Sequence, residues 1–299
     1  MTAPRRALWL AVCATIVATC TAAAFGAASP DVRHGRVLKT HLASAAVGDS
    51  ARTVRVYLPP SYDDADAATR RYPVVYVLHG WPGSDGNMLE FGHVNDTADS
   101  LIARGGIPEI IMVFPNGAGT GLLGRSYWID SYDGRRKLEQ FVAHDLVHWT
   151  DAHYRTQPVA AARAIVGLSE GGDAAVNIAF KHPDVFSACG GHSGDYVLEP
   201  GLGTSAFLGP EPGAAQLLRD NSPALYVARI APQLKAAGMR VYLDCGTSDE
   251  SIGHSREFDR ELTRLGIAHE FHEFPGSHTW GFWGRHFRES LLAVAGPLR

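Results

Sequence analysis

Apolar residues follow two different spacings along most of the chain. Four short runs are predominantly apolar, at residues 72–78, 109–114, 162–166 and 240–246. Three stretches place apolar residues at helical spacing, at residues 137–154, 172–180 and 255–265. Buried strands that alternate with helices are typical of a mainly parallel sheet covered on both faces. The pattern therefore predicts an α/β fold with helices on both faces of the sheet.

The regular alternation is preceded by a hairpin and interrupted twice. Residues 35–43 and 53–58 resemble two strands joined across Gly48. Two segments rich in Gly, Ser and Pro, residues 115–135 and 194–223, break the pattern. Both follow predicted strands at their carboxyl ends, where ligands bind in open α/β sheets. We expect these two segments to form part of the wall of a substrate site.

One five-residue motif lies between a predicted strand and a predicted helix. Gly167-Leu168-Ser169-Glu170-Gly171 has the pattern G-x-S-x-G. A serine on a sharp strand-to-helix turn has its hydroxyl exposed, and glycines beside it permit the turn and the close packing of the helix. The motif also arises by chance, so its meaning depends on partners elsewhere in the chain. We expect Ser169 to be a nucleophile.

A serine nucleophile needs a histidine to take its proton and a carboxylate to orient that histidine. In α/β-hydrolases the order along the chain is nucleophile, acid, histidine. Asp249 follows the predicted strand at 240–246, and His278 follows the next predicted strand, at 268–274. The order predicts Asp249 as the acid and His278 as the base.

Other residues compete for these two roles. The chain has 14 histidines, and His272 alternates with its neighbours on a predicted strand, so we interpret it as an ordinary strand residue. Glu250 and Asp244 are alternatives for the acid because they are close to Asp249 in the chain. Asp195 is a third alternative, since it follows the preceding strand, where some hydrolases place their acid.

Acyl transfer also needs donors for the oxyanion, usually two backbone N–H groups. The residue after the nucleophile, Glu170, is the first expected donor. The loop after the strand at 72–78 should supply the second. Pro82 in this loop has no N–H, so Trp81 is the expected donor. We interpret His79, in the same loop, as a structural residue.

Composition limits the classes of protein that fit the chain. Hydrophobic residues make up 45% and charged residues 19%, with a formal net charge of −4. A large core is therefore possible, disorder is not indicated, and no basic block suggests nucleic acid. No C-x-x-C or H-E-x-x-H spacing indicates a metal site, and we expect no cofactor. Cys189 and Cys245 should lie on neighbouring parallel strands, where disulfide geometry is poor, and are interpreted as buried thiols.

The amino terminus has the layout of a secretory signal. Two arginines precede an apolar run, which is followed by small residues. We expect residues 1–28 to be a signal peptide, residues 29–299 to form the folded domain, and the protein to be secreted or in the cell envelope. No stable membrane insertion is expected after cleavage. A retained anchor and lipid attachment at Cys20 are the alternatives.

Together these motifs resemble the esterase D/antigen 85-type family of α/β-hydrolases, which includes carbohydrate esterases, S-formylglutathione hydrolases and mycolyltransferases. The segments that carry the resemblance are 72–83, 126–130, 145–156, 167–172, 181–186, 245–249 and 276–283. The combination is specific to the family but not to a substrate. It implies an α/β-hydrolase fold, a triad of Ser169, Asp249 and His278, and oxyanion donors at Trp81 and Glu170.

The resemblance also indicates substrate contacts and one departure. Trp128, Asp130 and Trp280 lie in matching segments and are expected to contact the substrate. Many relatives carry methionine where this chain has Glu170. A carboxylate beside the oxyanion hole disfavours a developing anion unless it points away or is paired. We therefore hypothesise that Glu170 contacts an arginine or a polar group on the substrate.

Three functions are compatible with these observations. The leading hypothesis is a secreted serine esterase that acts on a small-molecule or carbohydrate ester. The second is an extracellular acyltransferase of mycolyltransferase type with a sugar acceptor, which the aromatic segment 276–283 resembles. The third is a non-catalytic binding protein of the cell envelope. An acid at Asp249 is more typical of the hydrolytic esterases, and an intact triad argues against the third function.

Overall fold

An eight-stranded sheet runs through the part of the chain that the computed structural model describes, which is residues 32–119, 124–201 and 205–298. Its order is β1 (Arg36–Ser44), β2 (Asp49–Leu58), β4 (Ile111–Pro115), β3 (Val74–Leu78), β5 (Arg163–Leu168), β6 (Ala188–His192), β7 (Arg240–Gly246) and β8 (His269–Phe274). The β1–β2 and β2–β4 pairs are antiparallel, and all others are parallel. The sheet confirms the predicted mainly parallel α/β fold and its amino-terminal hairpin.

Side chains on the central strands alternate between two apolar cores. On β3, Val74 and Tyr76 belong to one core, and Val75 and Val77 belong to the other. Because both faces of these strands are buried, their sequence is apolar without interruption. This explains why the strands were recognisable as continuous apolar runs.

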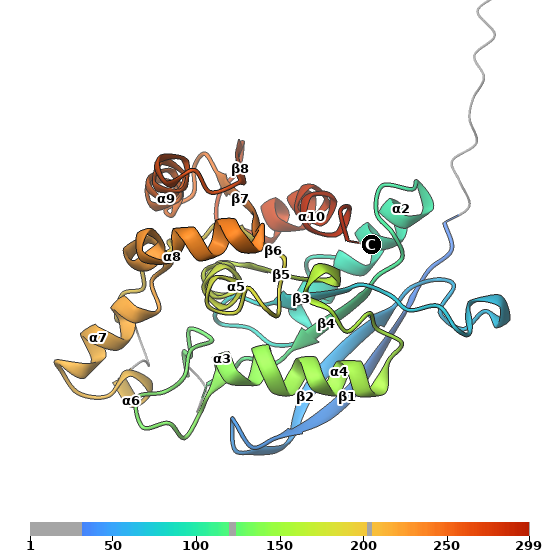
Figure 1. The fold of residues 1–299 in the computed structure, drawn as a ribbon, viewed down its shortest axis with the longest axis horizontal. Coiled ribbons are helices and arrows are strands. Elements are labelled where there is room, and N and C mark those ends of the chain that lie inside the picture. Colours follow the sequence, from blue (N-terminus) through green and yellow to red (C-terminus); the bar gives the residue numbers. More distant parts are fainter. Residues whose placement is uncertain (1–31, 120–123, 202–204, 299) are drawn as a thin grey trace, which may run out of the picture. The chain divides into compact units, whose positions relative to one another are not determined.

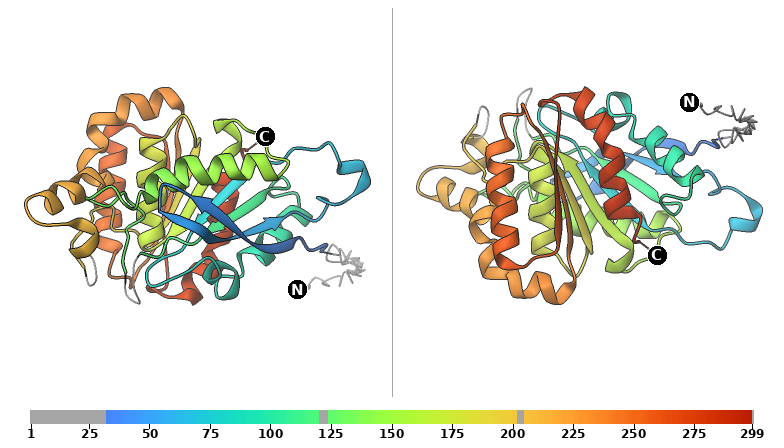
Figure 2. Two further views of the ribbon diagram at one scale, coloured as in Figure 1. Left: turned by 90° about the horizontal axis from the view of Figure 1, so that it is seen from below. Right: turned by 90° about the horizontal axis from the view of Figure 1, so that it is seen from above.

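Helices cover both faces of the sheet. The first core includes residues of α4 (Val147–His153), α5 (Glu170–Lys181), α8 (Pro223–Ala237) and α9 (Ile252–Leu265). The second core is formed with α2 (Val94–Ala103) and α10 (Trp280–Ala295). Figure 1 shows α2 and α10 on one side of the central strands and α4 on the other. Figure 2 shows α10 lying across the strands of its face.

The helix predicted at residues 137–154 is interrupted by a wider turn. It consists of α3 (Leu138–Gln140), a π-helical segment (Phe141–Leu146) and α4. The other short helices are α1 (Asn87–Glu90), α6 (Ser205–Leu208), α7 (Gly213–Asp220) and the 3-10 turns Ala65–Ala67 and Ala160–Ala162. Helices α6 and α7 lie in the second interruption of the pattern, whose short helices the sequence did not predict.

The two cysteines among the described residues, Cys189 and Cys245, are free and buried, as predicted. Cys189 on β6 is the register partner of Val241 on β7, so it does not lie opposite Cys245. The expected signal peptide at residues 1–28 lies outside the described residues. Among the helices that the structure describes, none combines the length and apolar character needed to cross a membrane.

Two glycines allow the turn between β5 and α5 to pack closely. A Cβ atom on Gly167 would lie 2.1 Å from the Gly171 carbonyl oxygen. A Cβ atom on Gly171 would lie 2.4 Å from the carbonyl oxygen of Leu78 on β3. These contacts are with backbone rather than with flexible side chains. The glycines of the motif are therefore required by packing.

We predict that Gly171→Ala destabilises the protein by about 3 kcal/mol or more, because the new methyl group overlaps backbone atoms of β3. Thermal unfolding should show a Tm lower by roughly 6–12 °C. Gly253→Ala in α9 is the matched control, since nothing lies within 4 Å of its added Cβ. Its Tm should be unchanged or slightly higher. Equal Tm values for the two variants would contradict the packing argument.

Candidate active site

Ser169 occupies the turn between β5 and α5 with φ 53° and ψ −128°. This backbone conformation is strained for a residue other than glycine and is the geometry expected of a nucleophile on a strand-to-helix turn. The Ser169 N–H donates to the His192 carbonyl at 2.8 Å, and the Ser169 carbonyl accepts from the Gly172 N–H at 2.8 Å. These hydrogen bonds to the neighbouring strand β6 and to α5 hold the turn in place.

The structure brings the three predicted triad residues together. His278 Nε2 lies 2.9 Å from Ser169 Oγ, and His278 Nδ1 lies 3.0 and 3.1 Å from the two oxygens of Asp249. Asp249 is 4% exposed and follows β7, while His278 follows β8. With Nδ1–H donating to Asp249, Nε2 is free to accept the serine proton.

The electrostatics of the pair suit a general base. Burial by itself would lower the pKa of His278, but the hydrogen-bonded Asp249 carboxylate outweighs it and raises the pKa. Burial would raise the pKa of Asp249, yet hydrogen bonds from His278 and the Ser251 N–H, together with an interaction with the Ser193 hydroxyl, lower it. Asp249 therefore remains a carboxylate and strengthens the affinity of His278 for a proton.

The alternative acids lie elsewhere. The Glu250 side chain is exposed. Asp244 is buried and is hydrogen-bonded to His192. Asp195 lies on the loop after β6 and is hydrogen-bonded to His254. In the described part of the chain, none of these acids is hydrogen-bonded to the His278 ring. His272 is a residue of β8, as interpreted from the sequence.

The loop after β3 begins with a neutral histidine. His79 Nε2 accepts from the Gly117 N–H at 3.0 Å, so its Nδ1–H donates to the Gly80 carbonyl at 2.8 Å. Burial lowers the pKa of His79 to about 4, which favours this neutral form. Among the described residues, no acceptor is bonded to the backbone N–H of Trp81 or of Glu170. Both groups are therefore available as oxyanion donors.

Glu170 is paired with an arginine, which is one of the two contacts that we hypothesised for it. Its carboxylate is 5% exposed, lies 2.6 Å from Arg125 Nε and accepts from the Tyr127 N–H at 2.9 Å. Burial raises the pKa of Glu170, and Arg125 opposes that shift. The Arg125 guanidinium also lies 5.5 Å from the Trp81 ring. Arg125 was not identified from the sequence, where it is one basic residue in a segment without periodicity.

The structure corrects one expected substrate contact, Trp128, and gives another, Asp130, a structural role. Trp128 is 1% exposed and donates from Nε1 to the His79 carbonyl at 3.2 Å, so it lies beneath the loop rather than facing the substrate. Asp130 accepts from the N–H groups of Glu139 and Gln140, and thereby caps the start of α3. Both residues support the framework of the site.

An aromatic cavity of about 450 Å³ adjoins the nucleophile. It is lined by Gly80, Trp81, Pro82, Leu168, Ser169, His278, Thr279, Trp280 and Trp283. Trp280, an expected substrate contact, does line this cavity. Trp283 packs edge-on against the Trp280 ring at 5.4 Å and against the His278 ring at 4.8 Å. The size is typical of a small-molecule site, and the three indole rings favour an apolar ligand.

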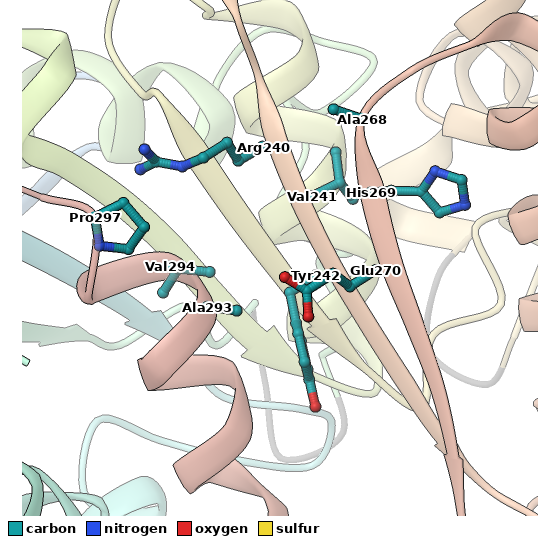
Figure 3. A pocket seen from close by; sticks show the side chains of 9 residues that line it. All are labelled: Arg240, Val241, Tyr242, Ala268, His269, Glu270, Ala293, Val294 and Pro297. Carbon is teal, nitrogen blue, oxygen red and sulfur yellow. The ribbon is translucent and has the colours of Figure 1, made fainter. Parts of the chain in front are cut away.

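A second cavity of about 240 Å³ lies at the other end of the sheet, between the starts of β7 and β8 and the end of α10 (Figure 3). Arg240, the first residue of β7, lines it. Its Nε and Nη2 atoms have no hydrogen-bond partner among the described residues. No serine or cysteine is among the described residues that line this cavity.

One group of described residues has ligand atoms close enough together to hold a metal ion, namely His34, Asp96 and Asp99. The Asp99 carboxylate already accepts hydrogen bonds from the Tyr57 hydroxyl at 2.6 Å and from the Gly35 N–H at 2.9 Å. Internal hydrogen bonds therefore account for the position of Asp99 without a metal.

The mainly parallel sheet, the strained serine turn and the chain order of Ser169, Asp249 and His278 are those of an α/β-hydrolase fold. A family model described as "Putative esterase" matches residues 44–294, and the chain belongs to this esterase family.

Known relatives are consistent with this assignment. The chain is 30% identical over 272 residues to an esterase of Mycobacterium tuberculosis, covering 82% of this chain and 56% of that protein. It is 26% identical over 184 residues to the diacylglycerol acyltransferase/mycolyltransferase Ag85B of Mycolicibacterium smegmatis, covering 50% of this chain and 54% of the relative. This chain thus spans about half the length of these curated relatives. A solved ferulic acid esterase is similar with a TM-score of 0.77 at 28% identity, covering 88% of this chain and 99% of that one.

We predict that kcat/KM falls at low pH with a midpoint above the ordinary histidine pKa of about 6.5. The reason is that protonated His278 cannot accept the serine proton, and Asp249 stabilises the protonated form. In Asp249→Asn the midpoint should move to lower pH, and kcat should fall by roughly 10⁴-fold as the ring loses its orientation. pH–rate profiles of both proteins measure the shift. Coincident midpoints would show that Asp249 does not act on His278.

We predict that Arg125→Gln lowers kcat by about tenfold or more, equivalent to ~1.4 kcal/mol, because it leaves a buried carboxylate uncompensated beside the oxyanion site. Glu170→Gln should cost less, since the amide oxygen can still accept from the Tyr127 N–H. The double variant Arg125→Gln/Glu170→Gln should recover part of the loss. Initial rates on several esters would measure all three. If the losses of activation free energy in the two single variants simply add up in the double variant, the charge argument is refuted.

Proposed function

We propose that this protein is a secreted serine esterase that hydrolyses carboxylic esters through a covalent acyl-enzyme. The observation that carries the proposal is the contact of 2.9 Å between Ser169 Oγ and His278 Nε2, with Asp249 on the other ring nitrogen. Nucleophile, base and acid are within hydrogen-bond reach of one another at the mouth of a cavity. This is the arrangement that acyl transfer requires.

The reaction proceeds in two halves. Ser169 Oγ attacks the ester carbonyl while His278 Nε2 takes its proton, and the backbone N–H groups of Trp81 and Glu170 stabilise the oxyanion. The tetrahedral intermediate then collapses, the C–O bond to the alcohol breaks, and His278 returns the proton to the leaving oxygen. Water, deprotonated by His278, attacks the acyl-enzyme and releases the carboxylic acid and free Ser169.

The cavity favours an apolar, aromatic acyl group. Trp81, Trp280 and Trp283 line the space beside Ser169. Flat rings pack favourably against indole edges and faces. The similarity to a ferulic acid esterase supports a planar aromatic acid as the acyl part. The alcohol part is a small molecule or a carbohydrate.

Export is the part of the proposal that rests on the sequence alone. Basic, apolar and small residues follow one another within residues 1–28 in the order of a secretory signal. A protein exported in this way would meet extracellular or cell-envelope esters.

An acyltransferase is the second candidate. The same triad would form the same acyl-enzyme, and a sugar hydroxyl would replace water. The observation that favours it is the similarity to a mycolyltransferase. The two activities differ only in what attacks the acyl-enzyme, so they must be separated by product analysis.

The test is an ester panel combined with active-site labelling. The mature protein should hydrolyse aromatic acyl esters faster than acetyl-sugar or long-chain esters, and a fluorophosphonate should label it. Ser169→Ala should lose labelling and at least about 10³-fold in kcat. Trp280→Ala should lose about tenfold in kcat/KM on aromatic esters and little on acetyl esters.

Partition of the acyl group between water and added trehalose separates the two enzymes. Free acid as the main product supports the esterase, and acylated trehalose as the main product supports the transferase. A wild-type protein that neither hydrolyses esters nor reacts with the fluorophosphonate would instead be a binding protein.

A further inference from the structure

A buried hydrogen-bond network lies behind the triad at the end of β6. His192 and Asp244 are both 0% exposed, and His192 Nδ1 lies 2.8 Å from Asp244 Oδ1. His192 Nε2 lies 2.9 Å from Ser290 Oγ on α10, and the Tyr242 hydroxyl donates to the second Asp244 oxygen at 2.9 Å. This is a second Ser–His–Asp arrangement. Because all its side chains are buried, no substrate can reach it, and its effect is to fix the His192 side chain.

The backbone of His192 holds the turn that carries the nucleophile. The His192 carbonyl accepts the hydrogen bond from the Ser169 N–H at 2.8 Å, and the next N–H, of Ser193, donates to the Asp244 carbonyl at 2.8 Å. The His192 ring also stacks on Phe287 of α10 at 5.0 Å. Contacts with β7 and α10 therefore fix the position of the His192 carbonyl, which holds the serine turn.

The hydroxyl of the adjacent Ser193 contacts the cavity wall and influences the acid. Ser193 is 1% exposed, and its Oγ accepts from Trp283 Nε1 at 3.0 Å. The same hydroxyl also helps to lower the pKa of the Asp249 carboxyl. A hydroxyl has one proton and two lone pairs, so it can accept from the indole while it donates to the carboxylate.

Ser193 makes these contacts from an unusual backbone conformation. Its φ is 53°, in the left-handed region that few residues other than glycine adopt. Strained residues of this kind persist where the surrounding structure holds them and are concentrated at functional sites. A glycine would relieve the strain, but it would have no hydroxyl for Asp249 and Trp283.

We propose that His192-Ser193 is a positioning dipeptide that sets the nucleophile, the acid and the acyl cavity relative to one another. His192 holds Ser169 through its carbonyl, and Ser193 holds Trp283 through its hydroxyl. We infer that the same hydroxyl also orients the Asp249 carboxylate. Neither residue touches the reacting atoms. The inference rests on the proposed serine esterase, since it concerns the same triad.

Ser193→Gly tests the proposal without straining the fold, because glycine readily adopts the φ of this position. On an acetyl ester, which is too small to fill the aromatic cavity, kcat should fall about tenfold or more while KM changes less than about twofold. The rate of fluorophosphonate labelling should fall in parallel, and Tm should not decrease. Ser187→Gly, at the other end of β6, is the control and should retain wild-type kinetics.

A double-mutant cycle separates positioning from general support of the fold. In an Asp249→Asn background, loss of the Ser193 hydroxyl should cost less than about threefold in kcat, because its partner carboxylate is already gone. A purely structural role would cost the same factor in both backgrounds. Trp283→Phe, which keeps an aromatic ring but removes the N–H, should likewise be non-additive with Ser193→Gly.

The outcomes are distinct. Wild-type kcat in Ser193→Gly, with ester hydrolysis intact, would overturn the positioning inference and leave the proposed function standing. Additive effects in both cycles would also overturn it. A wild-type protein without hydrolysis or labelling would overturn the proposed function and this inference with it.

Discussion

The hydrogen bond from the Ser169 N–H to the His192 carbonyl is the constraint on which the rest of the site depends. It ties a strained turn to the neighbouring parallel strand and fixes the direction in which the serine hydroxyl points. Parallel strands bring their carboxyl ends to one edge of a sheet. The loops after β7 and β8 therefore deliver Asp249 and His278 to the same edge, although 109 residues separate Ser169 from His278.

The charge distribution around this turn follows from the same geometry. In the proposed mechanism the first residue of α5 presents its N–H to the reacting carbonyl, so its side chain would lie beside a developing negative charge. Here that residue is an acid, and the pairing of Glu170 with Arg125 removes the conflict. The arginine also lies over the Trp81 ring, so the pair joins the oxyanion loop to the start of α5.

The sheet, the triad and the glycine contacts were predictable because each depends on local pattern and chain order. Strands buried on both faces are continuous apolar runs, and loops after successive parallel strands converge. Side-chain direction was not predictable in the same way. Trp128 lies in a segment that matches the family, but its φ of 58° belongs to a turn in which the ring is buried under the loop. Arg125 and Ser193 act through contacts with distant residues that leave no periodic pattern.

The most direct test of the account is to trap the acyl group during turnover of an aromatic ester. Rapid quenching followed by mass spectrometry of the intact protein and its peptides would measure the adduct and its position. The account predicts one acyl group per chain, on Ser169, at a level that rises before the steady state. Steady hydrolysis without an adduct on Ser169, or with an adduct on another residue, would contradict it.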